Sequence, residues 1–582
     1  MCRQYLPAGS DVPYIRILKP IIKLFFILLL WPVAAAAEEA HSQTGGHEQI
    51  MQSRMAQLQD SAMLYLDGNR IAATRLIPEL YANRNFSLAW EDPGKQEELI
   101  GIIREIDGEG LKPEDYLLES LVNFHGKGGR LTDEERVDFD ILLSESLVRL
   151  GYHLQFGKVD PRSLDPSWNL DRSLGNEEPA AIIQAAIDSD SIRAYIDRAI
   201  PRQPFYARYK KALADYRGIL ARGGWPAVPP GPSLKRGMTD PRVAVLRRRL
   251  LAEGILTDEA PGAPDHFDDS LEAAVTQFQQ RHGLDADGVA GKQTLAAMIV
   301  PVEDRIDQIR ANLERGRWVL KDIRGDFMII NIAGFEAYLV RDNRLVWRSR
   351  VMVGKSYRKT PVFRAEMNYL VFNPTWTVPP GILRNDILPK ARQNPAYLRE
   401  QRFEMLDREG RRVEPESLDW SVITGKKFPY TLRQLPGPEN ALGRIKFIFP
   451  NPYFVYLHDT PHKKLFANPE RTFSSGCIRV ENPLDLAELV LADPENWGPQ
   501  EIANAIASGK TRSVYLPEPL AIMLLYWTVV IEVDGVVHFR KDIYDRDARL
   551  LKALDGEFSI SLPEGLPEKY YNRGLKGSEP FN

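Results

Sequence analysis

The sequence predicts a multidomain α+β fold in which a helical first half precedes a β-rich second half. The chain has 582 residues, which is too many for one hydrophobic core, so several domains are expected. Up to about residue 320 the apolar residues recur with helical spacing, whereas from Asp326 onward they form runs rich in β-branched and aromatic residues. A Gly- and Pro-rich linker, residues 221–237, divides the helical half into two parts.

Residues 1–37 have the three parts of an export signal. Basic residues precede the apolar run from Leu24 to Ala37, the run ends in small residues, and the acidic EEAHS follows. The run is shorter than the ~20 apolar residues that a membrane-spanning helix needs, although Ile21 and Ile22 lengthen it. We therefore expect a signal peptide or an uncleaved signal anchor, with the rest of the chain exported and any membrane anchor confined to this end.

Residues 38–230 are expected to form a mainly helical scaffold domain. The clearest helix begins near Leu131, where Thr132 and Glu135 have capping-box spacing, and it ends before Gly157 and Pro161. Polar positions interrupt the apolar periodicity of this helix. Because the region contains no cluster of catalytic residue types, we assign it a structural role.

A compact three-helix module is predicted over residues 234–300. Its apolar faces are formed by Val243, Leu246 and Leu250, by Leu271, Val275 and Phe278, and by Leu295, Met298 and Ile299. The stretches VAVLRRRLLAEGIL and AVTQFQQRHGLDADGVAGKQTL resemble the peptidoglycan-binding-domain-1 family. The resemblance implies a module that binds glycan or peptide, and a spacer without a ligand stays open as the alternative. Residues 301–325 are expected to be a helical connector.

A β-rich domain is predicted over residues 326–515. Its strand-like runs include FMIINIAGFEAYLV, MNYLVFNPTWTV, GRIKFIF and FVYLH, and Asp342-Asn343 is placed to form a hairpin turn. The polar, helix-prone stretch at about 380–435 indicates an inserted helical subdomain that could cap a site. Residues 516–582 are expected to be a C-terminal segment that packs on the scaffold.

The exported part of the chain keeps one cysteine, Cys477, because Cys2 lies in the signal segment. A lone thiol forms no intramolecular disulfide, so it is either buried and inert or kept for its reactivity. A nucleophilic thiol needs a base, and the β-rich domain has two histidines. His458 ends the apolar run FVYLH, whereas His462 lies in the loop that follows, so we expect the more rigidly held His458 to be the base.

The residues beside Cys477 suit this chemistry. Gly476 permits a positive φ, and the backbone N–H groups of Gly476 and Cys477 could form an oxyanion hole. Asn482-Pro483 has the pattern of an N-cap and first residue of a helix. The start of that helix and the charge of Arg479 would both favour a thiolate. An ion pair with a carboxylate such as Asp485 is the alternative for Arg479.

The composition does not indicate a metal, a cofactor or a nucleic-acid partner. No cluster of His, Asp and Glu with metal-ligand spacing accompanies the thiol. The formal net charge is −4, and no long run of like charge suggests nucleic acid or a polybasic membrane anchor.

The blocks YLHDTP, from Tyr456, and SSGCIRV, from Ser474, resemble the YkuD-type catalytic domain of L,D-transpeptidases. GKSYRKTPVF, NPTWTVPPGI and GPENALGRIKF match the same family in the right order. YANRNF, FGKVDP and VDGVVHFRKDIYDRD extend the resemblance to its large Gram-negative members, which combine a scaffold, a peptidoglycan-binding module and a catalytic domain with a capping insertion. Asp459 stands where many smaller members have glycine, but the large members share it, so activity is still expected.

The resemblance implies a periplasmic cysteine acyltransferase that cross-links peptidoglycan stem peptides. Cys477 would attack the carbonyl of the diamino acid at position 3 of a tetrapeptide donor and expel the terminal D-alanine, with His458 as general base and then acid. The side-chain amine of an acceptor stem's diamino acid would open the acyl-enzyme and form a 3–3 cross-link. No cofactor is implied, and carbapenems are expected to react as covalent inhibitors.

The resemblance also implies roles for surrounding residues. Tyr456 would lie on the oxyanion side of the site, and Gly476 would supply a backbone N–H group there. Ser475 would orient His458 through its backbone carbonyl and border the substrate site. Arg479 would contact the substrate near the acyl carbonyl, and Trp376 would form a wall of the stem-peptide pocket.

Two other functions stay open at the level of sequence. An L,D-carboxypeptidase or endopeptidase would use the same acyl-enzyme with water in place of the acceptor amine. A non-catalytic peptidoglycan-binding scaffold would carry a vestigial thiol. Formation of cross-linked product and of a carbapenem adduct at Cys477 would separate these functions from transpeptidation.

Overall fold

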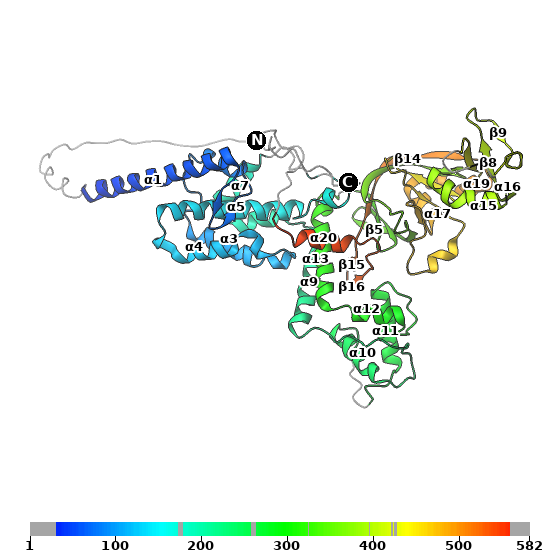
Figure 1. Ribbon diagram of the computed structural model, residues 1–582, viewed down its shortest axis with the longest axis horizontal. Helices are drawn as coiled ribbons and strands as arrows, with labels where there is room; N and C mark the ends of the chain where they lie inside the picture. The colour runs from blue at the N-terminus through cyan, green and yellow to red at the C-terminus, as the bar shows by residue number, and fades with distance from the viewer. Residues whose placement is uncertain are drawn as a thin grey trace, which may run out of the picture.

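The computed structural model describes residues 31–170, 172, 178–257, 263–323, 325–394, 396–420, 423 and 428–558. A helical part lies at one end of the molecule, a β-rich part lies at the other, and a three-helix module projects between them (Figure 1). The predicted α+β multidomain fold is thereby confirmed. Of the expected export signal, residues 1–30 lie outside the described residues, and residues 31–37 begin the first helix. Within the described ranges, no helix has both the length and the apolar character needed to cross a membrane.

The helical part is built around α5 (Asp133–Phe156). The predicted capping box is present, because Thr132 Oγ1 accepts a hydrogen bond from the Glu135 N–H group and the Glu135 carboxylate accepts one from the Thr132 N–H group. The polar residues that interrupt the periodicity are buried, and the carboxylates of Asp140 and Glu145 accept hydrogen bonds from backbone N–H groups of neighbouring segments. α5 is therefore enclosed on all sides, and these two carboxylates join it to its neighbours.

The remaining elements of the helical part are α1 (Trp31–Ser61), β1 (Tyr65–Leu66), β2 (Asn69–Arg70), α2 (Leu76–Asn83), α3 (Pro93–Arg104), η1 (Ile106–Glu109), η2 (Pro113–Tyr116), α4 (Leu118–Lys127), η3 (Gly128–Arg130), α6 (Pro161–Leu164), α7 (Pro179–Asp188), α8 (Ile192–Ala199) and α9 (Pro204–Ala221).

The three-helix module has its own small hydrophobic core. Its helices are α10 (Pro241–Ala252), α11 (Asp269–Arg281) and α12 (Lys292–Ile299). The predicted core residues of the three faces are buried, with the exception of Ile299, which is 44% exposed. That prediction was wrong because α12 ends at Ile299, so its side chain lies beyond the last turn that packs on the core.

The helix α13 (Val302–Val319) occupies most of the predicted connector and is buried along nearly its whole length. It packs against α9 and against α20 (Arg546–Leu554), which lies close to the C-terminus in sequence. Arg315 Nη1 on α13 lies 2.6 Å from Asp547 Oδ1 on α20. The connector is thus a buried helix that joins the end of the helical part to α20 near the C-terminus.

The β-rich part is a closed barrel with the strand order β11-β12-β13-β5-β4-β3-β14-β6. The strands are β3 (Phe327–Asn331), β4 (Glu336–Arg341), β5 (Arg344–Met352), β6 (Phe363–Phe372), β11 (Ile445–Ile448), β12 (Leu457–His458), β13 (Ile478–Val480) and β14 (Arg512–Leu525). Asp342 and Asn343 form the predicted two-residue turn between β4 and β5, and both have positive φ angles, as a type I′ turn requires. Because β14 continues to Leu525, the barrel extends beyond the predicted boundary at residue 515.

Three helices follow β13: α17 (Pro483–Leu491), α18 (Pro494–Trp497) and α19 (Pro499–Ala507). Proline is the first residue of α17, as the sequence predicts, but the Asn482 side chain makes no capping hydrogen bond.

The insertion between β6 and β11 forms a subdomain with a separate hydrophobic core, which we call the cap. It contains the predicted helices as α14 (Pro380–Ile382), the π-helical turn η5 (Leu383–Ile387), α15 (Leu388–Gln393) and α16 (Ala396–Glu400). It also contains an antiparallel sheet in the order β7-β10-β8-β9, formed by β7 (Trp376–Thr377), β8 (Phe403–Leu406), β9 (Arg412–Val413) and β10 (Thr431–Gln434). The expectation of a purely helical cap missed this sheet because its strands are too short to show a period in the sequence.

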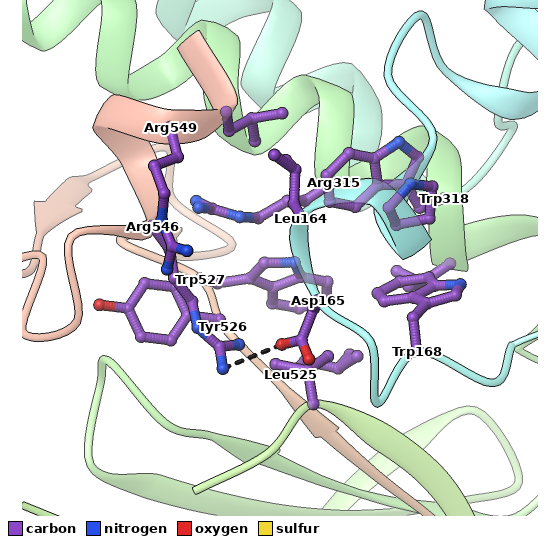
Figure 2. A pocket seen from close by; sticks show the side chains of 14 residues that line it. Leu164, Asp165, Trp168, Arg315, Trp318, Leu525, Tyr526, Trp527, Arg546 and Arg549 are labelled. Carbon is purple, nitrogen blue, oxygen red and sulfur yellow. Dashed lines mark ion pairs between the residues drawn. The ribbon is translucent and has the colours of Figure 1, made fainter. Parts of the chain in front are cut away.

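The C-terminal segment adds the hairpin β15 (Val529–Ile531) and β16 (Val537–Phe539) before α20, and residues 559–582 lie outside the described residues. Arg546 Nη2 on α20 lies 2.9 Å from Asp165 Oδ2, and tryptophans from three parts of the chain surround this ion pair (Figure 2). The cavity here has a volume of about 50 Å³. It can hold a few water molecules but is far smaller than the roughly 300 Å³ at which small-molecule pockets begin. The cavity is therefore a gap at the seam between domains and is too small to be a substrate-binding site.

Candidate active site

Two neighbouring barrel strands, β12 and β13, place a row of side chains on one face. Leu457 on β12 pairs with Ile478 on β13, and both are fully buried in the barrel core. Because side chains alternate along a strand, the residues beside them in the sequence project to the opposite face. These residues are Tyr456, His458, Cys477 and Arg479. The sequence-predicted thiol, its predicted base and two further predicted site residues therefore share one face of the sheet.

His458 is buried and held in one orientation. Its Nδ1 lies 2.5 Å from the backbone carbonyl oxygen of Asp459, which only accepts, so Nδ1 carries the proton and Nε2 is left as the basic atom. The expectation that the Ser475 carbonyl would orient the ring was therefore wrong, because the ring bonds to the next residue along its own strand. His462 is exposed on the following loop.

The charge state of His458 follows from its surroundings. Burial, reinforced by the charges of Arg479 and Lys446, lowers the pKa of His458 to about 3. Both cations are fixed beside it by strand pairing, since Lys446 on β11 pairs with His458 and His458 pairs with Arg479. The imidazole is consequently a neutral base at any physiological pH.

The Cys477 thiol contacts Phe454 and Tyr456, which lie just before β12. Its Sγ donates to the backbone carbonyl oxygen of Phe454 at 3.7 Å, and the hydroxyl and backbone N–H groups of Tyr456 also hydrogen-bond the sulfur. Burial raises the pKa of the Cys477 thiol, although the bonds from Tyr456 and the charges of Lys446 and Arg479 oppose this. The thiol is therefore neutral at rest. This corrects the expectation of a resting thiolate, because the cost of desolvation exceeds the help of the neighbouring cation.

Lys446 and Arg479 are cations close enough to the thiol for a negative sulfur to raise the pKa of each. The Lys446 Nζ atom lies 3.6 Å from the centroid of the Tyr456 ring, and burial lowers the pKa of both cations. Within the described residues neither has an ion pair with a carboxylate, so the alternative pair of Arg479 with Asp485 is not formed, and the buried Nε of Arg479 has no hydrogen-bond partner. Sequence reasoning missed Lys446, although alternation in GRIKFIF places it opposite the core positions Ile445 and Phe447.

The oxyanion donors differ from those expected. Gly476 has the positive φ that was expected, +117°, but its N–H group donates to Ser474 Oγ at 3.1 Å and is not free for a substrate. Its carbonyl oxygen accepts a hydrogen bond from Thr360 Oγ1 at 2.9 Å. Among the hydrogen bonds of the described residues, none uses the Cys477 N–H group. The free donor is therefore this N–H group. The Tyr456 hydroxyl, whose pKa burial raises so that it keeps its proton, contacts the sulfur at rest and can turn to the oxyanion once the sulfur is acylated.

Ser475 and Trp376 connect the site to the cap. Ser475 is exposed, and its Oγ accepts a hydrogen bond from Arg358 Nη1 at 2.7 Å. The same Arg358 atom lies 2.9 Å from Asp386 Oδ2 in η5 of the cap. Trp376, on β7, hydrogen-bonds the Tyr456 hydroxyl and is partly buried, so it lies where the cap meets the site. Sequence reasoning missed the role of Arg358, because its two partners, Ser475 and Asp386, lie 117 and 28 residues away along the chain.

Comparison with known protein families divides the chain into three matching regions. Residues 75–213 match the model of a "Scaffold domain", residues 239–298 match a "Putative peptidoglycan binding domain", and residues 325–512 match the YkuD "L,D-transpeptidase catalytic domain". The third region contains every site residue described above. The resemblance identified from the sequence blocks is thus confirmed.

A curated relative is similar to this chain over part of its length. The chain is 36% identical over 264 residues to a "Putative L,D-transpeptidase" of Haemophilus influenzae, and the match covers 44% of this chain and 53% of that protein, so the chain spans about half the length of this relative.

Two solved structures are also similar. The L,D-transpeptidase of Xylanimonas cellulosilytica (residues 123–326) is 15% identical, with 51% of this chain and 99% of that chain covered and a TM-score of 0.16. The L,D-transpeptidase of Stackebrandtia nassauensis is 13% identical, with 52% and 96% covered and a TM-score of 0.19. Scores this low support no inference, and the assignment depends on the family matches. Three consecutive regions of the chain thus match a scaffold domain, a peptidoglycan-binding domain and the YkuD-type L,D-transpeptidase catalytic domain.

Proposed function

We propose that the protein is a periplasmic L,D-transpeptidase that forms 3–3 cross-links between peptidoglycan stem peptides through a Cys477 acyl-enzyme. The observation that carries the proposal is the grouping of a partly exposed thiol, a neutral oriented imidazole and two cations without carboxylate partners on one face of the matched catalytic domain. A buried structural cysteine would have no need of these neighbours.

The first step begins from two neutral groups. As the bond between Sγ and the carbonyl carbon of the donor's third residue forms, the thiol proton passes to His458 Nε2. The Cys477 N–H group and the Tyr456 hydroxyl stabilise the negative oxygen of the tetrahedral intermediate. When the intermediate collapses, the bond to the terminal D-alanine breaks, and the leaving amine takes the proton from His458. The product is a thioester, and the imidazole is neutral again.

The second step uses the same groups in reverse order. The side-chain amine of an acceptor stem attacks the thioester, a C–N bond forms and the C–S bond breaks. His458 takes the proton of the amine and returns it to the sulfur, so the resting enzyme is regenerated. The scaffold and the peptidoglycan-binding domain would hold the glycan strands so that donor and acceptor reach the thiol together.

Lys446 and Arg479 act while the sulfur carries negative charge. Both lie on the strands that flank His458, and the sulfur is the group of opposite charge that raises the pKa of each. They oppose the desolvation cost as the S–H bond breaks, and the unpartnered Arg479 Nε can also donate to the carbonyl side of the acyl group. The arrangement therefore favours charge in the transition state over charge at rest.

Reaction with disaccharide-tetrapeptide tests the proposal. Protein lacking residues 1–37 should release D-alanine and form a cross-linked dimer, and Cys477→Ala should do neither. If only the tripeptide monomer appears at high acceptor concentration, the protein is a carboxypeptidase and the proposal fails.

A carbapenem supplies an independent check. Because Cys477 is the sole cysteine outside the first two residues, intact-protein mass spectrometry should find one adduct per chain and none on Cys477→Ala. A wild-type protein without an adduct would contradict a reactive thiol.

A further inference from the structure

The loop before β12 is held rigidly by one asparagine. The Asn451 Nδ2 atom donates to the carbonyl oxygens of Phe449 and Val455, each at 2.7 Å. Its Oδ1 accepts from the N–H groups of Tyr453 and Val455, each at 3.1 Å. Four hydrogen bonds from one side chain fix the backbone of residues 449–455, so the points from which the side chains of this loop project are set before any substrate binds.

Phe454, on this loop, combines two unfavourable features. Its φ is +54°, in the left-handed region that non-glycine residues other than Asn and Asp seldom adopt. Its side chain is 84% exposed, so the ring gains almost nothing from burial. A strained backbone that holds a large apolar ring in solvent has no benefit for folding. Such strain is concentrated at binding and catalytic sites, where the surrounding structure enforces it.

The residues on either side of Phe454 are anchored, and its own backbone touches the nucleophile. Val455 is buried, and the Tyr453 hydroxyl donates to the carbonyl oxygen of Ser167 in the helical part at 3.2 Å. The Phe454 carbonyl oxygen is the group 3.7 Å from Cys477 Sγ. The exposed Phe454 ring is therefore carried by a residue whose own backbone contacts the nucleophile.

We propose that Phe454 is a platform for the acceptor, on which the aliphatic side chain that bears the attacking amine lies as it approaches the thioester. This inference rests on the proposed function. The methylene groups of such a side chain cover the ring, and the terminal ammonium group is attracted to the ring face before it loses its proton.

We assign the Phe454 ring to the acceptor and not to the donor, because the two substrates are held in different ways. The donor is fixed covalently once the thioester exists, and Trp376 and the two cations already border its place on the strand face. The acceptor arrives from solvent and has only non-covalent contacts. A solvent-facing ring next to the nucleophile is the surface that it meets.

Phe454→Asn gives the sharpest test, because asparagine tolerates the left-handed conformation and the variant loses the ring without straining the loop. We expect the acceptor KM in the cross-linking assay to rise about three- to tenfold, the range of an aromatic or cation–π contact. The rate of acylation by a carbapenem should stay within about twofold of wild type, and Phe454→Tyr should restore the acceptor KM. Tyr515→Ala, which removes another exposed aromatic ring from the barrel, serves as the matched control.

Two outcomes would overturn the inference. An unchanged acceptor KM in Phe454→Asn would show that the ring does not hold the acceptor, and an equal loss of acylation rate would show that it acts on the nucleophile or the donor. Both are distinct from failure of the proposed function, in which the wild-type protein itself would form no cross-linked dimer. The melting temperature of each variant shows whether the fold is kept.

Discussion

At the scale of single residues, the resting protonation states of Cys477 and His458 determine the pH dependence of acylation. The pKa of His458 is lowered to about 3 from an ordinary value of 6.5, so the imidazole is unprotonated wherever a free histidine would titrate. Burial raises the pKa of the Cys477 thiol. Both groups are already in the protonation states from which the first step begins, so the acylation rate should be level through pH 6.5, with no ascending limb there.

Carbapenem adduct formation, followed by intact mass between about pH 4.5 and about pH 9.5, measures this profile directly. A half-maximal rate near pH 6.5 would mean that His458 titrates like an exposed histidine, contrary to the buried neutral imidazole described above.

Lys446 gives a second prediction at the same scale. Lys446→Met keeps a long apolar side chain over the Tyr456 ring and removes the charge that favours a negative sulfur. A unit charge at this range is worth about 1–2 kcal/mol after solvent screening, so acylation should slow roughly tenfold. Lys464→Met, at an exposed position nearby, is the control and should react like wild type. Equal acylation rates for the two variants would show that the charge of Lys446 does not assist acylation.

At the scale of elements, Arg358 links the nucleophile loop to the cap, since one guanidinium nitrogen contacts both Ser475 and Asp386. Exposed ion pairs add about 0–1 kcal/mol to stability, so breaking this one should leave the melting temperature nearly unchanged. It should slow acylation, because the loop that carries Cys477 loses its tie to η5. We expect Arg358→Ala and Asp386→Ala each to reduce the rate several-fold, and the double variant to be no slower than either. Strictly multiplicative effects in this cycle would show that the two residues act independently.

The elements also show what sequence reasoning could and could not reach. The sequence singles out Cys477 and His458 as candidates because the thiol is the sole one in the chain expected to be exported and the histidine ends an apolar run. Lys446 could have been found, since strand alternation places it on the same face. The Gly476 N–H group was assigned wrongly because its partner, the Ser474 hydroxyl, is a local side chain whose direction the sequence does not reveal. Phe454 gave no signal, because left-handed backbone at phenylalanine is unexpected from residue preference.

At the scale of the whole molecule, three segments far apart in the sequence meet at one seam: the stretch around Asp165, α13 and α20. α13 and α20 bring Arg315 to Asp547. Arg546 on α20 also pairs with Asp165 (Figure 2), so the helical part, the connector and the C-terminal helix share partly buried ion pairs. Removing one partner of such a pair leaves the other charge uncompensated. The seam therefore favours a fixed relation between scaffold and catalytic domain, which a flexible linker would not provide.

Hydrogen bonds also connect the seam to the residue before the nucleophile, and they begin at Tyr544, which precedes α20. Its hydroxyl donates to the carbonyl oxygen of Gly354 at 2.5 Å and accepts from the Thr360 N–H group at 3.2 Å. The Thr360 hydroxyl in turn holds the Gly476 carbonyl next to Cys477. Tyr544→Phe keeps the ring and leaves these buried backbone groups unsatisfied, at a cost of about 1–3 kcal/mol.

We expect Tyr544→Phe to slow carbapenem acylation about tenfold, because a cost of about 1.4 kcal/mol is a factor of ten if it appears in the transition state. The exposed Tyr515→Phe loses a hydroxyl without this connection and should not change the rate. The two variants are compared by adduct formation and by melting temperature. If Tyr544→Phe lowers the melting temperature but acylates at the wild-type rate, the C-terminal segment stabilises the fold without positioning the thiol.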